Sequence, residues 1–204
     1  MAGRLLEDDP ETAYAHAAEA ARRAGRVDVV REAAGITAYR TGRYAEALRE
    51  LRTARRLSGG DEHVPLMADC ERGLGRPERA LELAAEHSTL PPEVAVELAI
   101  VVSGARLDLD QPEAALAALA TPQVRAAVGE QALRVTEARA TALAACGRTD
   151  EAAALLATLP PEDDEPVVVV DLAEADDVDA GPLGNEGSAV PDAPDRAADE
   201  DGTE

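Results

Sequence analysis

The sequence predicts an all-α fold built from repeated helix pairs and followed by a disordered acidic tail, and three observations support this prediction. First, similar segments recur along residues 1–160 at spacings of 33 to 37 residues, as in helical repeat architectures. Second, 45 of the 204 residues are Ala, whereas Phe and Trp are absent and Tyr occurs three times. A core of Ala, Leu and Val without aromatic rings requires closely packed helices. Third, residues 161–204 concentrate Pro, Gly and acidic side chains, which favours a disordered tail.

Five short segments mark the start of one helix in each repeat. Each contains an acidic residue shortly before an aligned Ala, and three of the five open with Pro. Pro is favoured at the first helical position, and an acidic side chain in the first turn complements the helix dipole. The aligned residues are Ala13, Ala47, Ala80, Ala115 and Ala152. The pattern predicts helices that begin at Pro10, Tyr44, Pro77, Pro112 and Thr149.

A further helical stretch lies upstream of each of the last four starts. These stretches are rich in Ala, Leu, Val and Arg and cover residues 28–41, 62–74, 93–107 and 130–146. In three cases a Gly-Arg pair directly precedes the next helix start, as expected where a helix ends on a left-handed Gly. The unit is therefore a first helix, a tight turn and a second helix. The predicted units are a partial one at 1–26 and complete ones at 27–60, 61–92, 93–129 and 130–160.

Residues 28–61 form the clearest copy of this unit. Gly35 and Ala38 are small enough for close helix approach, Tyr44 follows the turn, and Leu51 shares one face of the second helix with Ala47, Ala54 and Leu57. This period and layout resemble the tetratricopeptide repeat (TPR) family. The resemblance implies a TPR-like α-solenoid of antiparallel helix pairs, with about four and a half units.

Two features depart from the regular TPR pattern. Arg31 stands where the family usually has Trp or a large apolar residue, and Ala34 and Ala38 replace its usual Leu and Tyr. The first unit also begins midway along its first helix, because Met1 falls about where Gly35 falls in the next unit. A half unit leaves the apolar face of its neighbour uncovered. We therefore expect either a true start upstream of Met1 or a partner that covers this end.

The TPR resemblance also implies that the first helices of successive units line a groove for a peptide of a partner protein. The family's groove positions fall here on Glu32, Ile36, Tyr39, Arg40, Glu62, Asp69, Arg72, Glu97, Ile100, Leu107, Arg134, Glu137 and Thr141. These side chains are mixed in charge and mildly apolar, and solvated helix faces explain each of them singly. The clamp that chaperone-binding TPR proteins place on a C-terminal carboxylate has no counterpart in this sequence.

Arg is concentrated in residues 22–56, where ten Arg accompany four acidic residues. Three of them, Arg49, Arg52 and Arg56, fall on one helical face by their spacing. An ordinary solvated face explains this cluster. The alternative is a basic patch for an acidic segment, because guanidinium groups match carboxylates. The nearest acidic segment is the protein's own tail.

The tail at 161–204 carries 16 acidic residues and a single basic one, Arg196. High charge with frequent Pro and Gly predicts disorder, because too little apolar surface can be buried to offset the ordering entropy. An apolar run at 167–172 interrupts it. This run is either a docking motif for a partner or a stretch that packs transiently on the folded part. We expect the tail to fold back on the Arg-rich units and to compete with an external acidic partner, since a tether raises local concentration.

The composition excludes several classes of function. A chain without Lys has no Schiff-base, phosphate-loop or Ser-Lys chemistry. A pI near 4.4 and only three Tyr argue against nucleic-acid binding, which depends on clustered cations and stacking aromatics. The longest nearly apolar run, at 95–102, is too short to span a bilayer. The isolated Cys70 and Cys146 fit a reduced cytoplasm.

The three His residues lack Cys or carboxylate neighbours at metal-ligand spacing, so we expect neither a metal nor a cofactor. The sequence thus predicts a cytoplasmic, non-catalytic scaffold or adaptor that binds a protein or peptide, and neither nucleic acid nor membrane. The first alternative is a regulatory subunit of an enzyme or transcription complex, with the acidic tail as an autoinhibitory switch. A further alternative is an enzyme whose site uses Asp69, Arg72 and Glu137.

Overall fold

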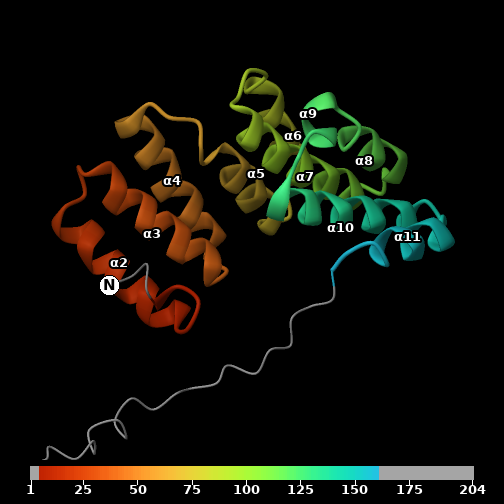
Figure 1. The fold of residues 1–204 in the computed structure, drawn as a ribbon. Coiled ribbons are helices and arrows are strands. Elements are labelled where there is room, and N and C mark those ends of the chain that lie inside the picture. The colour runs from red at the N-terminus through yellow and green to blue at the C-terminus, as the bar shows by residue number, and fades with distance from the viewer. Residues whose placement is uncertain (1–4, 161–204) are drawn as a thin grey trace, which may run out of the picture. The chain divides into compact units, whose positions relative to one another are not determined.

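The structure is a computed structural model that describes residues 5–160. These residues form ten helices and no strand (Figure 1), which confirms the predicted all-α class. The first helices of the predicted units are α3 (Asp28–Arg40), α5 (Val64–Gly73), α7 (Pro92–Asp108) and α10 (Gly129–Ala145). The second helices are α2 (Pro10–Arg23), α4 (Tyr44–Ser58), α6 (Pro77–Glu86), α8 (Pro112–Ala118) and α11 (Thr149–Leu156). A short helix, α9 (Pro122–Arg125), follows α8 and is absent from the sequence prediction.

All five second helices begin at the residues that the sequence predicts. The first position of α2, α6 and α8 is Pro, whose missing N–H would have no partner inside the helix at that position. At the start of α2, the Asp9 carboxylate accepts a hydrogen bond from the Thr12 N–H at 3.0 Å. This side-chain cap satisfies one of the free N–H groups of the first turn.

One backbone motif ends the first helix of each complete unit. After α3, the Arg43 N–H donates to the Ala38 carbonyl at 2.8 Å, and bonds of the same span follow α5, α7 and α10. This Schellman motif requires a left-handed residue directly before the donor. In three turns that residue is Gly, with φ between 71° and 75°, as the Gly-Arg pairs predict. In the turn after α7 it is Asp110, with φ of 57°, so an ordinary L-residue takes the place of Gly there.

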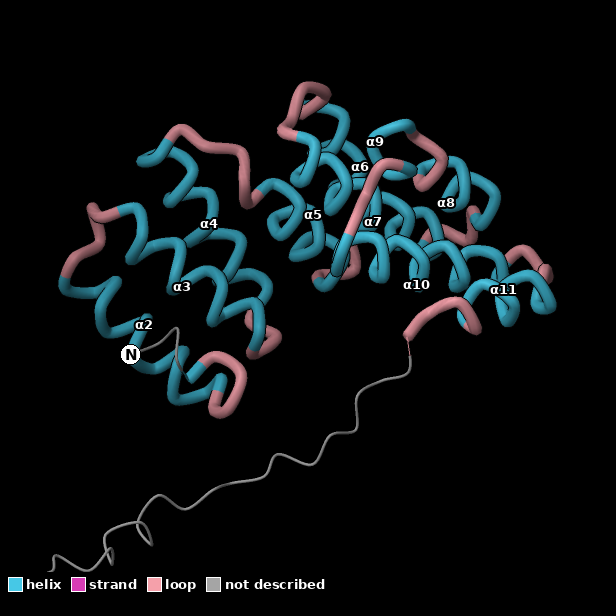
Figure 2. Tube along the Cα trace, in the orientation of Figure 1, coloured by secondary structure: helices cyan, strands magenta, loops and turns pink. Residues whose placement is uncertain are grey.

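The helices pack in chain order. Each helix from α2 to α7 contacts the one that follows it, and α10 contacts α11. First helices also touch one another, because α5 contacts α7 and α7 contacts α10. Figure 2 shows the short connections between the helices, of which those from α4 to α5 and from α6 to α7 are the longest. Within residues 5–160, α5, α7 and α10 therefore form a row whose members are neighbours in space.

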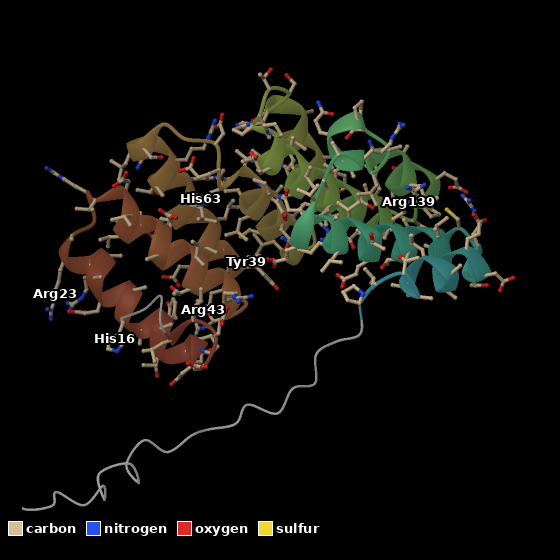
Figure 3. All side chains as sticks on the ribbon, in the orientation of Figure 1. His16, Arg23, Tyr39, Arg43, His63 and Arg139 are labelled. Carbon is tan, nitrogen blue, oxygen red and sulfur yellow. The ribbon has the colours of Figure 1, made fainter. Side chains whose placement is uncertain are left out.

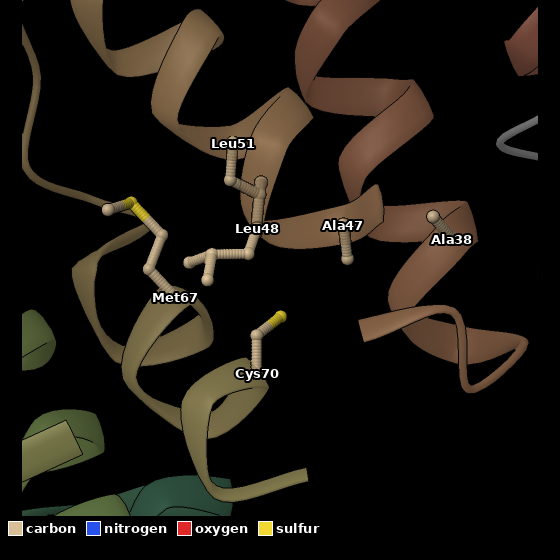
Figure 4. Packing of buried hydrophobic residues seen from close by; sticks show 6 residues of the cluster. All are labelled: Ala38, Ala47, Leu48, Leu51, Met67 and Cys70. Carbon is tan, nitrogen blue, oxygen red and sulfur yellow. The ribbon is translucent and has the colours of Figure 1, made fainter. Parts of the chain in front are cut away.

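Small side chains let these helices approach closely. The five aligned Ala residues are all buried, with at most 5 % of their surface exposed. The largest core cluster joins α3, α4 and α5 and consists of Ala38, Ala47, Leu48, Leu51, Met67 and Cys70 (Figure 4). A Cβ at Gly35 would come within 2.7 Å of the Leu51 side chain, so the close approach of α3 and α4 requires this Gly. Burial raises the pKa of the Cys70 thiol to about 12, which keeps it a neutral packing group.

Two buried glutamates join α3, α4 and α5 through guanidinium groups. Glu50 on α4 pairs with Arg31 of α3 and, at 2.9 Å, with Arg49. Glu71 on α5 pairs with Arg52 of α4 at 2.9 Å. Burial opposes the ionisation of Glu50, but the bonds from Arg31 and Arg49 outweigh it and hold the pKa of Glu50 below its ordinary value. Arg31 therefore neutralises a buried carboxylate of the neighbouring helix.

The predicted acidic tail, its apolar run at 167–172 and the first four residues lie outside the described part of the chain. Predictions about their structure and contacts stay predictions. Among the helices of residues 5–160, none combines the length and apolar character needed to cross a membrane.

Candidate functional site

Side chains on or beside α3, α5, α7 and α10 line one cavity of about 510 Å³, which we call the inner groove. Each of these helices is the first helix of a predicted unit. Five apolar side chains of the groove are half-buried, namely Tyr39, Leu66, Val94, Ile100 and Val101, and Pro65 beside them is buried. Figure 3 labels Tyr39 on α3 and His63 just before α5, both of which line the groove. The repeat period thus brings residues far apart in the chain to one surface.

A chain of polar contacts runs along the groove from α3 to α7. The Tyr39 hydroxyl donates to Asp69, whose other carboxylate oxygen accepts from Arg72 at 2.7 Å. Arg72 also donates through Nε to Asp108, the last residue of α7, at 2.8 Å. Burial acts to lower the pKa of Arg72, but the carboxylates of Asp108 and Asp69 outweigh it and raise that pKa. Burial and the bond to Asp69 raise the pKa of Tyr39, so both donors keep their protons near neutral pH.

Arg72 reaches Asp108 because α7 has no side chain in its path. A Cβ at Gly104 would come within 2.5 Å of Cζ of Arg72. The guanidinium group therefore occupies the space that any other residue at this position would fill. A side chain at position 104 would therefore displace the guanidinium group from its present position.

A second ion pair ties α10 to α7 in the same groove. Arg134 of α10 pairs with Glu97 of α7 at 2.6 Å, and Gln131 donates to the same carboxylate at 3.0 Å. The Gln131 amide also lies 3.0 Å from the backbone carbonyl of Glu93. The groove therefore contains two guanidinium groups, each bound by carboxylates of the same surface.

A neighbouring cavity of about 540 Å³, which we call the turn cavity, shares Asp69 and Arg72 with the inner groove. It is also lined by Tyr44, Glu78 and Asp108 and by the turn after α5. The two cavities therefore adjoin at the Asp69–Arg72 pair.

The structure brings more than half of the predicted groove positions together in the inner groove. These residues are Tyr39, Glu62, Asp69, Arg72, Glu97, Ile100 and Arg134. They lie on all four first helices and on the segment before α5.

The other predicted positions do not line the inner groove. Ile36 packs against the core cluster of α3, α4 and α5. Glu32 lies 3.4 Å from His63, which itself lines the groove. Arg40 and Glu137 are exposed on α3 and α10, and Leu107 and Thr141 also lie outside the lining set.

Sequence reasoning missed several lining residues, which include His63, Leu66, Val94, Val101 and Gln131. Helical spacing contained the signal for three of them. Leu66 lies three positions before Asp69, Val101 four after Glu97, and Gln131 three before Arg134. Residues at these spacings share a helix face.

Contacts within the protein engage two members of the predicted basic patch. Arg49 bonds to Glu50, and Arg52 bonds to Glu71. Arg56 has no ion-pair partner among residues 5–160 and lines a small cavity of about 300 Å³ together with Arg52. An acidic ligand at this patch stays a prediction.

In the described part of the chain, no three His, Cys, Asp or Glu residues are grouped so that they could hold a metal ion. Comparisons with protein-family models, with curated proteins and with solved structures give no match for this chain. The functional assignment therefore depends on the geometry and chemistry of the inner groove.

Proposed function

We propose that this protein is a non-catalytic cytoplasmic scaffold or adaptor that binds a segment of a partner protein in the inner groove. The observation that supports this proposal most strongly is the groove itself, to which the first helices of successive units contribute side chains. TPR solenoids resemble this chain in period and bind peptides on the corresponding surface. The proposal includes a TPR-like solenoid of about four and a half units for the repeat region.

The packing order of the helices supports the solenoid part of the proposal. Each first helix contacts its own second helix, and α5, α7 and α10 contact one another in sequence. The left-handed turn recurs at the same place in each complete unit. Repeated units that contact only their neighbours are the defining property of a solenoid.

The state of the groove side chains supports a binding role over a catalytic one. Asp69, Arg72, Glu97 and Arg134 are all held in ion pairs, and the Tyr39 hydroxyl is held by Asp69. A surface that is fixed before the ligand arrives loses less conformational entropy on binding. This favours recognition of a partner segment.

The alternative of a regulatory subunit with an autoinhibitory tail depends on free cations along α4. Arg49 and Arg52 are engaged with Glu50 and Glu71. No contact of the described residues therefore favours the switch over the scaffold.

Affinity capture with a matched pair of variants tests the proposed function. Val94→Arg places a long charged side chain in the groove at the third residue of α7. Val29→Arg makes the same change at the second residue of α3, where Val29 is 60 % exposed and outside the groove lining. The tagged full-length protein and both variants are used to capture partners from native lysate, with circular dichroism as a check of folding.

We expect wild type and Val29→Arg to retain the same partner protein and Val94→Arg to lose it. The proposal is wrong if Val94→Arg is folded and retains every partner that wild type retains.

A further inference from the structure

The inner groove and the turn cavity have a strongly asymmetric charge. Their lining includes six carboxylates and two guanidinium groups. The carboxylates belong to Glu62, Asp69, Glu78, Glu93, Glu97 and Asp108. The guanidinium groups belong to Arg72 and Arg134. Their formal charges leave this surface negative, whichever protein segment binds there.

Both cations of this surface are already neutralised. Arg72 lies between Asp69 and Asp108, with N–O distances of 2.7 and 2.8 Å. Arg134 pairs with Glu97 at 2.6 Å. Because both guanidinium groups are engaged in these ion pairs, an anionic ligand would find no unpaired guanidinium group on this surface.

Three carboxylates of the surface remain available. Glu78 and Glu93 are exposed, and neither has an ion-pair partner among residues 5–160. Glu62 is 53 % exposed at its side chain, and the one ring nitrogen near it is His63 Nε2, at 3.9 Å. A cation placed beside these groups would gain Coulomb energy that no Arg of the protein already supplies.

Four apolar side chains of the inner groove, which we call the groove floor, set a second requirement for the ligand. Leu66, Val94, Ile100 and Val101 line the same cavity and are half-buried. A ligand that covers them removes apolar surface from water, which is favourable in proportion to the area covered. A small hydrophilic cation would leave these apolar side chains exposed to water.

We propose that the occupant of the inner groove is a cationic, amphipathic segment of the partner protein, with Leu-like side chains on the groove floor. Its Lys or Arg side chains lie against Glu62 and Glu93, and against Glu78 where the segment extends into the adjoining turn cavity. This inference depends on the proposed function and adds the chemical class of the ligand. The same excess of carboxylates disfavours an acidic ligand, because like charges repel.

Three synthetic probes measure the charge preference. They are peptides of about 12 residues with Leu at helical spacing. All remaining positions are Lys in the first probe, Gln in the second and Glu in the third. Fluorescence anisotropy reports their binding to the full-length protein at about 50 mM and about 500 mM salt. We expect the Lys probe to bind about tenfold or more tightly than the Gln probe, with the Glu probe weakest and the preference reduced at high salt.

A pair of double variants distinguishes the effect of the groove carboxylates on probe binding from the effect of the protein's overall negative charge. Glu62→Gln with Glu93→Gln removes two free carboxylates of the groove. Glu86→Gln with Glu113→Gln removes two exposed carboxylates from α6 and α8, outside both cavities. The tail is unchanged in both. We expect the groove pair to weaken the Lys probe about three- to tenfold and the control pair to leave it within about twofold of wild type.

The inference is wrong if the Gln or Glu probe binds as tightly as the Lys probe, if the Lys probe does not bind, or if both double variants weaken it equally. The Val94→Arg variant distinguishes this failure from failure of the proposed function. If a Gln or Glu probe binds wild type best and Val94→Arg abolishes that binding, the groove is a binding site for a ligand of another class. If the Lys probe binds Val94→Arg as tightly as wild type, binding does not occur in the groove and both proposals fail.

Discussion

The guanidinium group of Arg72 on α5 donates to both carboxylate oxygens of Asp108 at the end of α7, at 2.8 and 3.3 Å. The same group reaches Asp69 on its own helix. Arg72 therefore connects two consecutive first helices and lies where the inner groove meets the turn cavity. This side chain therefore lines both cavities.

The substitution Gly104→Ala should destabilise the protein only when Arg72 is present. In wild type, Gly104→Ala should lower the free energy of unfolding by about 1–2 kcal/mol, because the new Cβ displaces the guanidinium group. In an Arg72→Ala background the same change should stabilise by up to about 1 kcal/mol, since Ala is the better helix former. Urea denaturation followed by circular dichroism measures both. Equal effects in the two backgrounds would show that Gly104 and Arg72 are not coupled.

Asp110 occupies a left-handed position that Gly occupies in the other complete units. Replacing it with Gly should raise the free energy of unfolding by about 1 kcal/mol, because Gly adopts this conformation without steric cost. Asp110→Ala should lower it. Thermal unfolding of the three proteins tests the order Gly, Asp, Ala, and any other order contradicts the assigned turn.

Glu50 should make the protein sensitive to acid. Arg31 and Arg49 hold its folded-state pKa below the ordinary value of 4.5, so its contribution to stability is present above 4.5 and is lost as pH falls through the folded-state pKa. Glu50→Gln should cost about 3 kcal/mol at pH 7, because it leaves guanidinium charge without its buried partner. The difference between wild type and variant should shrink in acid. A difference that is constant from neutral pH to acid would refute this assignment.

Residues of the predicted basic patch should differ in how much they contribute to stability. Arg52→Met should destabilise the protein by about 1–3 kcal/mol, because it removes the 2.9 Å partner of the buried Glu71. Arg56→Met should change stability by less than about 0.5 kcal/mol, since Arg56 is exposed and has no ion-pair partner among residues 5–160. Parallel denaturation curves compare them, and equal losses would mean that the patch acts as one unit.

The repeat register explains how much of the fold could be predicted from sequence. An aligned Ala and an acidic first turn mark each second helix, and these local signals located the starts from Pro10 to Thr149. α9 was missed because it is four residues long, from Pro122 to Arg125, which is too short for helical periodicity to appear. Asp110 was missed because no sequence rule requires Asp in place of Gly at a left-handed turn.

The candidate site could be predicted only in part, because contacts between side chains of different helices depend on packing. The positions predicted from the repeat pattern include residues that line the inner groove, such as Tyr39 and Asp69. They do not specify ion pairs between helices, because the Arg72–Asp108 contact depends on the space at Gly104. They also do not reveal that Arg49 and Arg52 are engaged by buried glutamates. Charge patterns along a sequence indicate cations and anions, whereas their pairing is a property of the packed structure.

Hydrogen–deuterium exchange of the full-length protein with and without the Lys probe is the most direct test of the inner groove as the binding site. Binding there should slow exchange in α5 and α7, which supply most of its lining, and in the first half of α10 around Gln131 and Arg134. Exchange in α4, α6 and α8 should stay unchanged. Slower exchange confined to α4, α6 or α8, or no change in α5 and α7 at a saturating concentration of probe, would contradict a groove built from the first helices.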